Sequence, residues 1–534
     1  MPMEIQSRVG NVTQPDAAET QRAPEGGVQS APAYAYGGLR ALLVIAAIAL
    51  GFHIVEGMNG DTSSLLTVGE RWLAGMRPYV DAIEINPPMS VLLFLPAAWL
   101  GQFSGVKPET LVFVFVVAAA FVAIETAVRA LWRHGLVDNP ARTRLALGFA
   151  LLVLPLSTFA EREQFAVVAL TPIWAVMRIR AAGARPSPGL VVAAGFAAGL
   201  AVAIKPQFGA AVLLPALAVV RAERRFAVLF VPEYWLAGCV VAVYAASVYV
   251  LFPGYVSFAL PLTLDVYRPV REPLSVLIFA DAMPWLALAL AGLWVVARKR
   301  LGEPAIAIPL LAAAGFLVAL IEQGKGFAYH YYPVAAALMP ALVDRGVALA
   351  NARLAAGTEL NDRIVAVVGF LIGAIGVAMA TLTFQGMARP MAGLMPAIAA
   401  VSPHPSIAVI TPHAWIGHPL VRDVGGRWVG PTSHGWVTLG ALYKLGLTNA
   451  GEAEQRRLSA LIDWDKEALA AAVARERPDI VLVEHDDRVL PAWFSSPAEL
   501  KAFLAGYRPR FDYVGIEMWV RDDLDTGLPA VSGR

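Results

Sequence analysis

Residues 59–88 read NGDTSSLLTVGERWLAGMRPYVDAIEINPP and form a polar stretch between two runs of apolar residues. Asp61 follows the first apolar run directly, and two further carboxylates, Asp81 and Glu84, precede the Pro-Pro step that ends the stretch. The apolar runs on either side approach the length of a membrane helix. The sequence therefore predicts a polar loop, 58–87, at the end of a membrane helix.

The composition indicates a membrane protein. Of the 534 residues, 57% are hydrophobic and 16% are charged, and the mean hydropathy is +0.60, whereas soluble globular chains have about 45–50% apolar and about 25% charged residues. Cys239 is the single cysteine, which excludes a disulfide-rich secreted scaffold. Lys and Arg number 42 against 41 Asp and Glu. Because no basic excess can neutralise phosphates, nucleic acid is not an expected partner.

Apolar blocks of about 15–25 residues predict an α-helical polytopic membrane protein with about 11–13 transmembrane helices. The first block, 39–57, is not arranged like a cleaved signal peptide, and we expect it to remain as a membrane anchor. The other blocks are 88–103, 108–132, 143–159, 164–178, 189–204, 207–220, 227–252, 276–297, 303–321, 327–343 and 364–384.

Arginine-rich loops predict the orientation of the chain, because loops with Lys and Arg stay in the cytoplasm. Five such loops alternate with poorly basic ones. They contain Arg133, Arg142 and Arg144; Arg178, Arg180 and Arg185; Arg221, Arg224 and Arg225; Arg298, Lys299 and Arg300; and Arg345, Arg353 and Arg363. The segments predicted to face outside are 58–87, 160–163, 205–207, 253–275, 322–326 and everything after 384.

One conflict remains in this topology. An odd number of crossings must separate the outer loop 58–87 from the loop that contains Arg133, yet two apolar blocks lie between them. The block 88–103 is short for a bilayer that takes about 20 helical residues. A partial or re-entrant helix at 88–103 would remove the conflict.

Three regions are predicted along the chain. Residues 1–37 lack periodicity and apolar runs and indicate a disordered cytoplasmic tail. Residues 38–384 form the membrane domain, and 385–534 form a soluble α/β domain on the outer face. In the last region, SIAVIT (406–411), DIVLVE (479–484) and YVGIEMWV (513–520) have the pattern of strands, and 453–476 and 498–507 have that of helices.

Two groups of carboxylates are candidates for chemistry. The first lies in the loop 58–87, where residues 62–75 have the pattern of an amphipathic helix on the membrane surface. The second is EREQF (161–165), predicted at the outer mouth between two apolar runs. An ionisable residue at membrane depth costs about 2.5–3.5 kcal/mol on insertion scales, which favours function for Glu161, Arg162 and Glu163. The alternatives are solvation of the first loop and, in the second group, a structural ion pair or snorkelling to the interface.

Basic residues are predicted on the same outer face. Lys205 interrupts an apolar stretch at a point where Pro206 would end a helix. Lys325 follows another apolar run, and the outer loop 253–275 contains Arg271. Lys205 and Lys325 are notable because positive charge is disfavoured in outer loops.

The segment EQGKGFAYHYYP (322–333) places His330 and Tyr331 beside two other tyrosines. They are candidates for binding a ligand. An interfacial aromatic belt would explain the tyrosines equally well, and His330 could be an interface histidine.

Carboxylates and cations together suit one kind of chemistry. A carboxylate can take the proton of an attacking hydroxyl group or hold a divalent cation. Lys and Arg can stabilise a phosphate leaving group in a site of low dielectric constant. An enzyme that uses a lipid-phosphate donor needs both at the membrane surface.

The sequence resembles the C-type (GT-C) membrane glycosyltransferases, a superfamily that includes the protein O-mannosyltransferases and the aminoarabinose transferases of lipid A. Asp61 lies just after the first helix, and GERWLAGMRPYVDAIEINPP (69–88) is similar to the family's first outer loop. EREQF occupies the place of the second acidic motif, and KPQF (205–208) and KGFAYHYYP (325–333) look like motifs of the bacterial branch. The resemblance rests on the order of these motifs and covers about 40–384.

The resemblance implies inverting transfer of a sugar from a polyprenyl-phosphate donor on the outer, periplasmic face of the bacterial inner membrane. The acceptor would be a lipid, a glycan or a protein, and membrane lipids surround the enzyme. Asp61 would be the catalytic carboxylate, with Glu161 or Glu163 as the second acidic group. The residues assigned to substrate binding are Arg162, Lys205, Arg271, Lys325, His330, Tyr331, Asp81 and Glu84.

The second acidic motif departs from the family pattern, because some relatives have a single Asp where this chain has Glu-Arg-Glu. The departure leaves open which carboxylate acts. It also leaves open whether a divalent cation such as Mg²⁺ or Mn²⁺ takes part, in which case Asp61 and Glu163 would be its ligands.

Two other functions compete with glycosyl transfer. A transporter or flippase of lipid-linked saccharides would carry its charges in helix centres, whereas these lie at the outer ends. A non-catalytic scaffold would bind partners through 385–534. Other polar residues are predicted to be solvated surface groups: His404, His413, His418, His434 and the two aspartates of Asp463-Trp464-Asp465.

Overall fold

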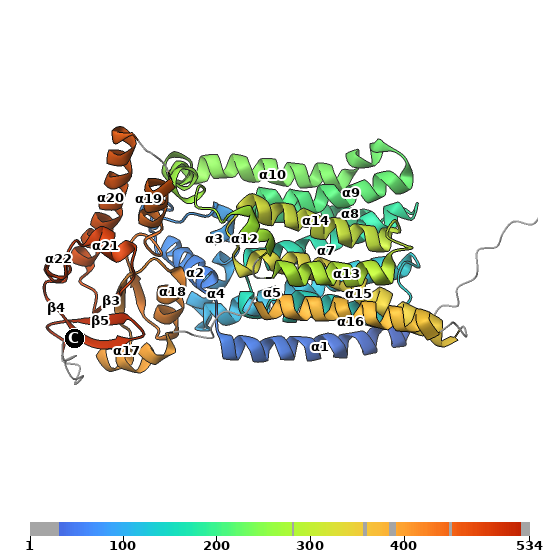
Figure 1. The fold of residues 1–534 in the computed structure, drawn as a ribbon, viewed down its shortest axis with the longest axis horizontal. Helices are drawn as coiled ribbons and strands as arrows, with labels where there is room; N and C mark the ends of the chain where they lie inside the picture. The colour runs from blue at the N-terminus through green and yellow to red at the C-terminus, as the bar shows by residue number, and fades with distance from the viewer. Residues whose placement is uncertain (1–30, 280–281, 356–359, 384–390, 448–450, 525–534) are drawn as a thin grey trace, which may run out of the picture.

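Long apolar helices lie side by side in one bundle, and an α/β domain sits at one end of it (Figure 1). The computed structural model describes residues 31–279, 282–355, 360–383, 391–447 and 451–524. The predicted tail lies mostly outside this part of the chain. Helix α1 begins at Ala31, inside the range predicted for the tail.

The bundle has the composition of a multi-pass membrane protein, as predicted. Within the described residues, five helices are long and apolar enough to span a bilayer: Gly38–Glu56, Pro108–Arg133, Arg162–Ala181, Phe226–Leu251 and Pro304–Gln323. The bundle helices are α1 (Ala31–Glu56), α5 (Pro108–Arg133), α6 (Pro140–Gly148), α7 (Arg162–Ala181), α8 (Pro188–Ile204), α9 (Ala210–Glu223), α10 (Pro232–Leu251), α13 (Met283–Ala297), α14 (Pro304–Gln323), α15 (Ala328–Ala355) and α16 (Leu360–Thr383). Short helical segments join them: η1 (Phe149–Val153), η2 (Leu156–Thr158), η3 (Pro206–Gly209), η4 (Phe226–Phe230), η5 (Tyr255–Ala259), α11 (Leu260–Leu262), η6 (Thr263–Tyr267) and α12 (Leu274–Phe279).

The block 88–103 does not cross the bundle. It forms α3 (Pro88–Leu92) and α4 (Leu95–Ser104), and ten helical residues span about 15 Å, half of a hydrocarbon core of about 30 Å. Glu109, at the start of α5, forms an ion pair with Arg422 of the α/β domain. The segment between α1 and α5 therefore starts and ends on the same side, which removes the conflict in the predicted topology.

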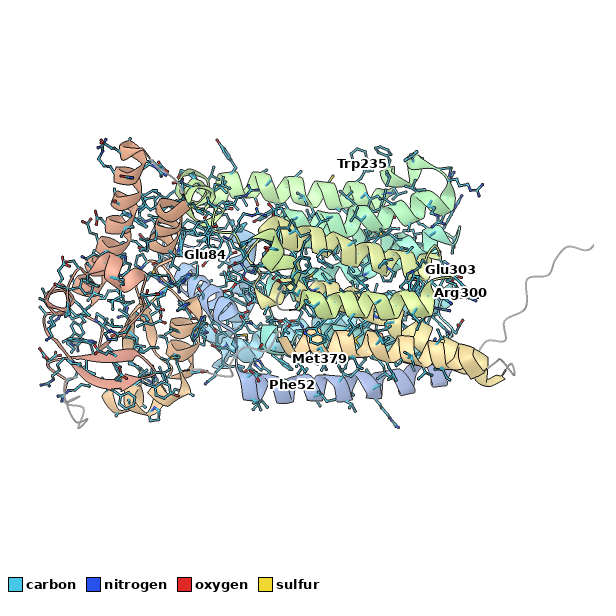
Figure 2. The ribbon with its side chains drawn as sticks, viewed as in Figure 1. Phe52, Glu84, Trp235, Arg300, Glu303 and Met379 are labelled. Atoms are coloured by element: carbon cyan, nitrogen blue, oxygen red, sulfur yellow. The ribbon has the colours of Figure 1, made fainter. Side chains whose placement is uncertain are left out.

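The loops rich in arginine lie at the other end of the bundle, away from the α/β domain. Arg142 forms an ion pair with Asp344 at 2.7 Å, which joins two of these loops. Figure 2 shows Arg300 and Glu303 at the same end. The alternation of basic and poorly basic loops thus corresponds to the two ends of the bundle.

Helix α2 (Gly60–Leu73) corrects one expectation about the first loop. It does not lie free on a membrane surface. Residues 62–69 are buried, because α2 packs between α4 and α18 (Ala414–Asp423) of the α/β domain. Its apolar face meets protein, and the loop is thereby held between the two parts of the molecule.

The α/β domain contains one five-stranded sheet in the order β2-β1-β3-β5-β4. Strands β1, β2 and β3 run parallel, whereas β5 is antiparallel to both β3 and β4. The strands are β1 (Ser406–Ile410), β2 (Arg427–Val429), β3 (Ile480–Glu484), β4 (Tyr507–Tyr513) and β5 (Ile516–Arg521). β1 and β3 fall within the predicted strands, and β5 overlaps the predicted strand 513–520 but begins later and ends one residue beyond it, at Arg521. β2 and β4 were not predicted as strands.

Alternate side chains of the strands face two separate cores, as expected from the period of two. Ile407 and Val409 pack toward η7 (Ala392–Leu394), α17 (Met395–Val401) and α18. Ala408 and Ile410 pack toward the helices on the other face. Those helices are α19 (Trp436–Leu447), α20 (Glu452–Glu476), α21 (Val489–Trp493) and α22 (Pro497–Phe503). Layers on both faces explain why the central strands are apolar throughout.

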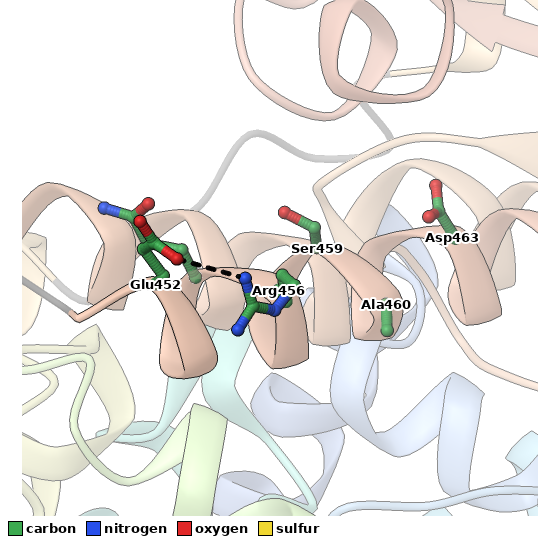
Figure 3. Close-up of a pocket in the computed structure, with 6 residues that line it drawn as sticks. Glu452, Arg456, Ser459, Ala460 and Asp463 are labelled. Atoms are coloured by element: carbon green, nitrogen blue, oxygen red, sulfur yellow. Dashed lines mark hydrogen bonds and ion pairs between the residues drawn. The ribbon is translucent and has the colours of Figure 1, made fainter.

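Helix α20 presents a solvated face, on which Glu452 and Arg456 form an exposed ion pair at 3.3 Å (Figure 3). Asp463 lies on this face, as predicted. Asp465 does not, which corrects the prediction of two solvated aspartates. It is 2% exposed and accepts hydrogen bonds from the backbone N–H and hydroxyl of Thr438 at 3.1 and 2.8 Å. Burial raises the pKa of Asp465 to about 6.

Candidate active site

The first turn of α2 positions Asp61. Asn59 caps the helix by accepting a hydrogen bond from the backbone N–H of Thr62 at 2.9 Å. The Asn59 amide also donates to the carbonyl of Phe159 at 2.8 Å, and the Thr62 hydroxyl donates to the carbonyl of Ala160 at 3.1 Å. These contacts tie the start of α2 to the segment that leads into α7.

The backbone at Ala160 turns the chain so that charged residues begin α7. Ala160 has a φ of +65°, a left-handed conformation that costs a non-glycine residue about 1 kcal/mol or more. Its N–H donates to the side chain of Gln164 at 2.5 Å. Glu161 therefore takes the N-cap position, and Arg162 and Glu163 form the first turn of the helix.

An ion pair joins the two predicted acidic motifs. Arg162 Nη2 donates to Asp61 Oδ2 at 2.5 Å, and the Tyr329 hydroxyl donates to the same oxygen at 3.0 Å. Arg162 also donates to the side chain of Asn86 and lies 3.7 Å from Glu161. The side chain of Arg162 is 3% exposed and that of Asp61 is 32% exposed, so Asp61 is the more accessible residue of the ion pair.

A second buried ion pair lies beside the first. Lys205 ends α8 and donates to Glu163 Oε1 at 2.6 Å and to Gln323 Oε1 at 2.7 Å. His330 Nε2 lies 3.8 Å from the same Glu163 oxygen. Neither Glu161 Oε2 nor Glu163 Oε2 has a hydrogen-bond partner among the described residues.

These groups surround a cavity of about 840 Å³ between the bundle and the α/β domain. Its volume falls within the about 300–1,000 Å³ of small-molecule sites. The predicted residues that line it are Asp61, Glu84, Glu161, Arg162, Lys205, Lys325 and His330. Glu163 is not among the lining residues and lies behind Lys205, fully buried.

Lys325 is held in a different way from the other cations. Its ammonium group donates to the carbonyl of Tyr267 at 2.5 Å and to that of Val270, and it lies 4.0 Å from the centre of the Tyr267 ring. No carboxylate forms an ion pair with it among the described residues. Burial, with a contribution from the nearby Arg271, lowers the pKa of Lys325 to about 8.

Glu84 also lines the cavity and is 4% exposed. It accepts hydrogen bonds from the backbone and the side chain of Asn86 at 3.0 and 2.6 Å. Burial raises the pKa of Glu84, and the Asn86 hydrogen bonds partly oppose this effect.

Besides Glu163, three other predicted site residues are not among those that line the cavity. Asp81 pairs with Arg77 at the surface at 2.8 Å, and the hydrogen bonds from Arg77 lower the pKa of Asp81 to about 2. Arg271 donates to the carbonyl of Ile321 at 2.7 Å. Tyr331 is 1% exposed and packs in the core of the bundle. These three side chains therefore do not share the cavity that Asp61 lines.

Sequence reasoning missed several residues that line the cavity. The sequence patterns around them do not point to a site, because an Asn before a Pro-Pro step or a Tyr among other aromatic residues commonly has a structural role. The missed residues are Asn59, Asn86, Tyr267, Arg268, Gln323, Tyr329, Trp415, Ser433 and Trp436.

The four histidines in the first part of the α/β domain are not all surface groups, which corrects the prediction. His404 is exposed, but His418 is 2% exposed and stacks on Trp428 with the ring centres 3.9 Å apart. His413 and His434 are half-buried and line the cavity.

The residues do not form a metal site of the expected kind. Within the described part of the chain, no group of three or more His, Cys, Asp or Glu side chains is arranged to hold an ion. Asp61 Oδ2 is bound by Arg162 and Tyr329, and Glu163 Oε1 is bound by Lys205. We therefore derive no step through a metal ion, and the involvement of Mg²⁺ or Mn²⁺ stays a hypothesis.

The described fold agrees with the fold that the resemblance in the sequence implies, as a comparison with solved structures shows. No protein-family model matches the chain, and no curated protein matches it in sequence. Among solved structures, it is similar to ArnT from Cupriavidus metallidurans, the lipid A aminoarabinose transferase, in the apo state. That comparison gives 14% identity and a TM-score of 0.55 over 90% of this chain and 97% of ArnT. ArnT bound to undecaprenyl phosphate gives 13% identity and a TM-score of 0.52 over 92% and 98%.

Proposed function

We propose that this protein transfers a sugar, with inversion, from a polyprenyl-phosphate donor to an acceptor on the outer face of the bacterial inner membrane. One observation carries the proposal. A cavity at one end of the membrane bundle combines the open carboxylate of Asp61 with the cations of Arg162, Lys205 and Lys325. The basic loops at the opposite end support an outward-facing site.

The cations suit the phosphate of the donor. Arg162 and Lys205 already pair with carboxylates, whereas Lys325 contacts carbonyl oxygens and the Tyr267 ring and pairs with no carboxylate among the described residues. Its charge is thus the least compensated, and we assign it the first contact with the phosphate. The similarity to an ArnT structure with bound undecaprenyl phosphate supports a lipid donor of this type.

The transfer is a single displacement. An acceptor hydroxyl oxygen attacks C1 of the sugar, the bond between C1 and the phosphate oxygen breaks, and the configuration at C1 inverts. Asp61 takes the hydroxyl proton as general base. The positive groups stabilise the charge that develops on the departing polyprenyl phosphate.

The burial of the carboxylates favours Asp61 as the base. Glu163 is not among the lining residues and is paired with Lys205. Glu161 lines the cavity but is only 3% exposed. Asp61 is open, although its Oδ2 is shared with Arg162 and Tyr329. We assign Glu161 the role of a second acidic group that holds Arg162 from behind.

A transporter of lipid-linked saccharides is less consistent with this geometry. A transport path needs polar groups along the depth of the membrane. The residues that line this cavity come from the bundle end next to the α/β domain and from that domain itself.

The proposal is tested with purified protein in detergent and a panel of radiolabelled polyprenyl-phosphate sugars. Water serves as a poor acceptor, so slow release of free sugar reports the reaction without knowledge of the true acceptor. We expect release from at least one donor. Folded protein that binds the lipids but releases no sugar would contradict the proposal and favour a transporter. Parallel assays with EDTA decide whether a divalent cation takes part.

A further inference from the structure

The α/β domain forms one wall of the cavity, which we call the neutral wall. It consists of Pro412, His413, Ala414, Trp415, Pro419, Ser433, His434, Trp436, Leu439 and Gly440. None of these described residues is Lys, Arg, Asp or Glu. The cations Arg162, Lys205 and Lys325 all come from the membrane bundle and its loops. The two sides of the cavity therefore suit ligands of different charge.

The neutral wall lies directly beside Asp61. A Cβ atom added to Gly60, the residue before Asp61, would lie 2.8 Å from Trp415 Cα. His434 and Asp61 line the same cavity, where burial lowers the pKa of His434 to about 4 and the charge of Asp61 partly opposes this effect. The His434 imidazole is thus neutral at pH 7.

The neutral wall offers aromatic surface and uncharged hydrogen-bonding groups. Trp415 is 40% exposed. Trp436 is 2% exposed, and its indole N–H has no hydrogen-bond partner among the described residues. Ser433 and His434 lie within hydrogen-bond distance of each other at 2.9 Å. A buried donor without a partner is costly, so a ligand that bonds to Trp436 would gain affinity.

Residues behind the wall hold it in place. The His413 ring lies 5.3 Å from that of Trp415. His413 Nδ1 is 3.1 Å from both Glu484 oxygens, and its Nε2 is 3.1 Å from Arg488. The loop after β1 and the loop after β3 are joined by these contacts, so Trp415 presents a supported surface to the cavity.

We infer that the neutral wall binds the acceptor, and that the acceptor presents an uncharged sugar ring; this inference rests on the proposed function. The C–H face of a sugar ring packs on an indole, and its hydroxyl groups need donors and acceptors such as His434 and Trp436. A phosphate or an ammonium group would need an opposite charge, which this wall does not supply. A hydroxyl group of such a ring would lie within reach of Asp61.

The test measures how the donated sugar divides between an added acceptor and water. The probes are methyl α-mannopyranoside, methyl β-galactopyranoside and methyl β-glucopyranoside, compared with glucose 6-phosphate and glucosamine. Both products arise from the same donor complex, so their ratio does not depend on the amount of folded protein. We expect transfer to at least one neutral glycoside and no preference for the charged sugars.

Two variants then test the wall. Trp415→Ala should lower the ratio of transfer to hydrolysis by about tenfold, because it removes the stacking surface. Trp436→Phe keeps the shape and removes the N–H, and should lower the ratio by about two- to tenfold. Trp235→Ala is the matched control, because Trp235 is 63% exposed and lies at the opposite end of the bundle (Figure 2). It should leave the ratio unchanged.

Three results would overturn the inference: a ratio unchanged in both cavity variants, a preference for charged sugars, or hydrolysis without transfer to any neutral glycoside. If the wild type hydrolyses no donor, the proposed function fails. Sugar binding by the neutral wall is then tested by saturation-transfer NMR with the same methyl glycosides. A signal on their ring protons that Trp415→Ala abolishes supports the wall as a sugar site, and no signal contradicts it.

Discussion

Lys325 gives the site a pH dependence that can be assigned to one residue. Its pKa is lowered to about 8, so its ammonium group is charged at pH 7 and loses its charge as the pH rises through 8. The proposed donor is a phosphodiester, which keeps its charge over this range. We expect the donor KM to rise about tenfold between pH 7 and 9. Steady-state release of sugar measures this change.

Lys325→Arg is the control for this effect, because a guanidinium group stays charged at pH 9. The donor KM of this variant should vary little with pH. A wild-type KM that is equal at pH 7 and 9, or an arginine variant with the same slope, would remove Lys325 from phosphate binding.

The buried pair of Lys205 and Glu163 makes a prediction about stability. Lys205→Met leaves a buried carboxylate without its cation, which costs about 3–5 kcal/mol in free energy of unfolding. Combining Lys205→Met with Glu163→Gln should recover most of this loss. Chemical denaturation in detergent measures the wild type and both variants.

Arg225→Met provides a matched comparison, because the ion pair of Arg225 with Glu223 lies at the surface. Loss of this ion pair should lower the free energy of unfolding by about 0–1 kcal/mol. If Lys205→Met and Arg225→Met lower the free energy of unfolding equally, the pair of Lys205 and Glu163 is not shielded from water as described.

At the scale of elements, the start of α2 is the part that places Asp61 against the α/β domain. Gly60→Ala would bring a Cβ to 2.8 Å from the Trp415 backbone, so the junction has to shift. A displacement of about 1 Å can cost about a hundredfold in rate. We therefore expect Gly60→Ala to lower the turnover number by about ten- to a hundredfold, measured as initial rates at saturating donor.

Gly238→Ala is the control for Gly60→Ala. Gly238 lies in α10, and a Cβ there would meet no atom within 4 Å. Its turnover number should equal that of the wild type. Normal turnover in Gly60→Ala would mean that the position of α2 against Trp415 does not matter for catalysis.

At the scale of the whole molecule, Arg422 joins the α/β domain to the bundle. It donates to Glu70 of α2 at 2.7 and 2.9 Å and also to Glu109 of α5. Arg422→Ala should lower the apparent free energy of unfolding by about 1.5–3 kcal/mol. It should also speed hydrogen exchange in residues 412–436, because the cavity wall is then less restrained.

Arg456→Ala is the comparison, since Arg456 forms an exposed ion pair with Glu452 inside the α/β domain and outside residues 412–436. It should leave exchange in 412–436 unchanged. If both arginine variants behave alike, Arg422 does not hold the two parts together.

The sequence predicted the bundle, the basic end and three strands, because these depend on local composition and periodicity. It did not predict β2, which has three residues, or β4, which contains a proline and is half-exposed. Arg162 was predicted because charges are rare at membrane depth, and Lys205 because positive charge is disfavoured in outer loops. Asp61 was predicted from its place in the first outer loop, through the family resemblance. Tyr329 and Trp415 were missed because their roles arise from contacts with residues far away in the chain, which no local pattern reports.

The central claim is that Asp61 is the general base of a sugar transfer, and two matched variants test it most directly. Asp61→Asn and Asp81→Asn each remove one carboxylate from the same loop, but only Asp61 lines the cavity. The measurement is the release of radiolabelled sugar from the polyprenyl-phosphate donor at saturating concentration. We predict a loss of about 10²–10⁴-fold for Asp61→Asn, with donor binding retained, and a rate within about twofold of the wild type for Asp81→Asn. A rate for Asp61→Asn near that of the wild type, with both proteins folded, would contradict the assignment.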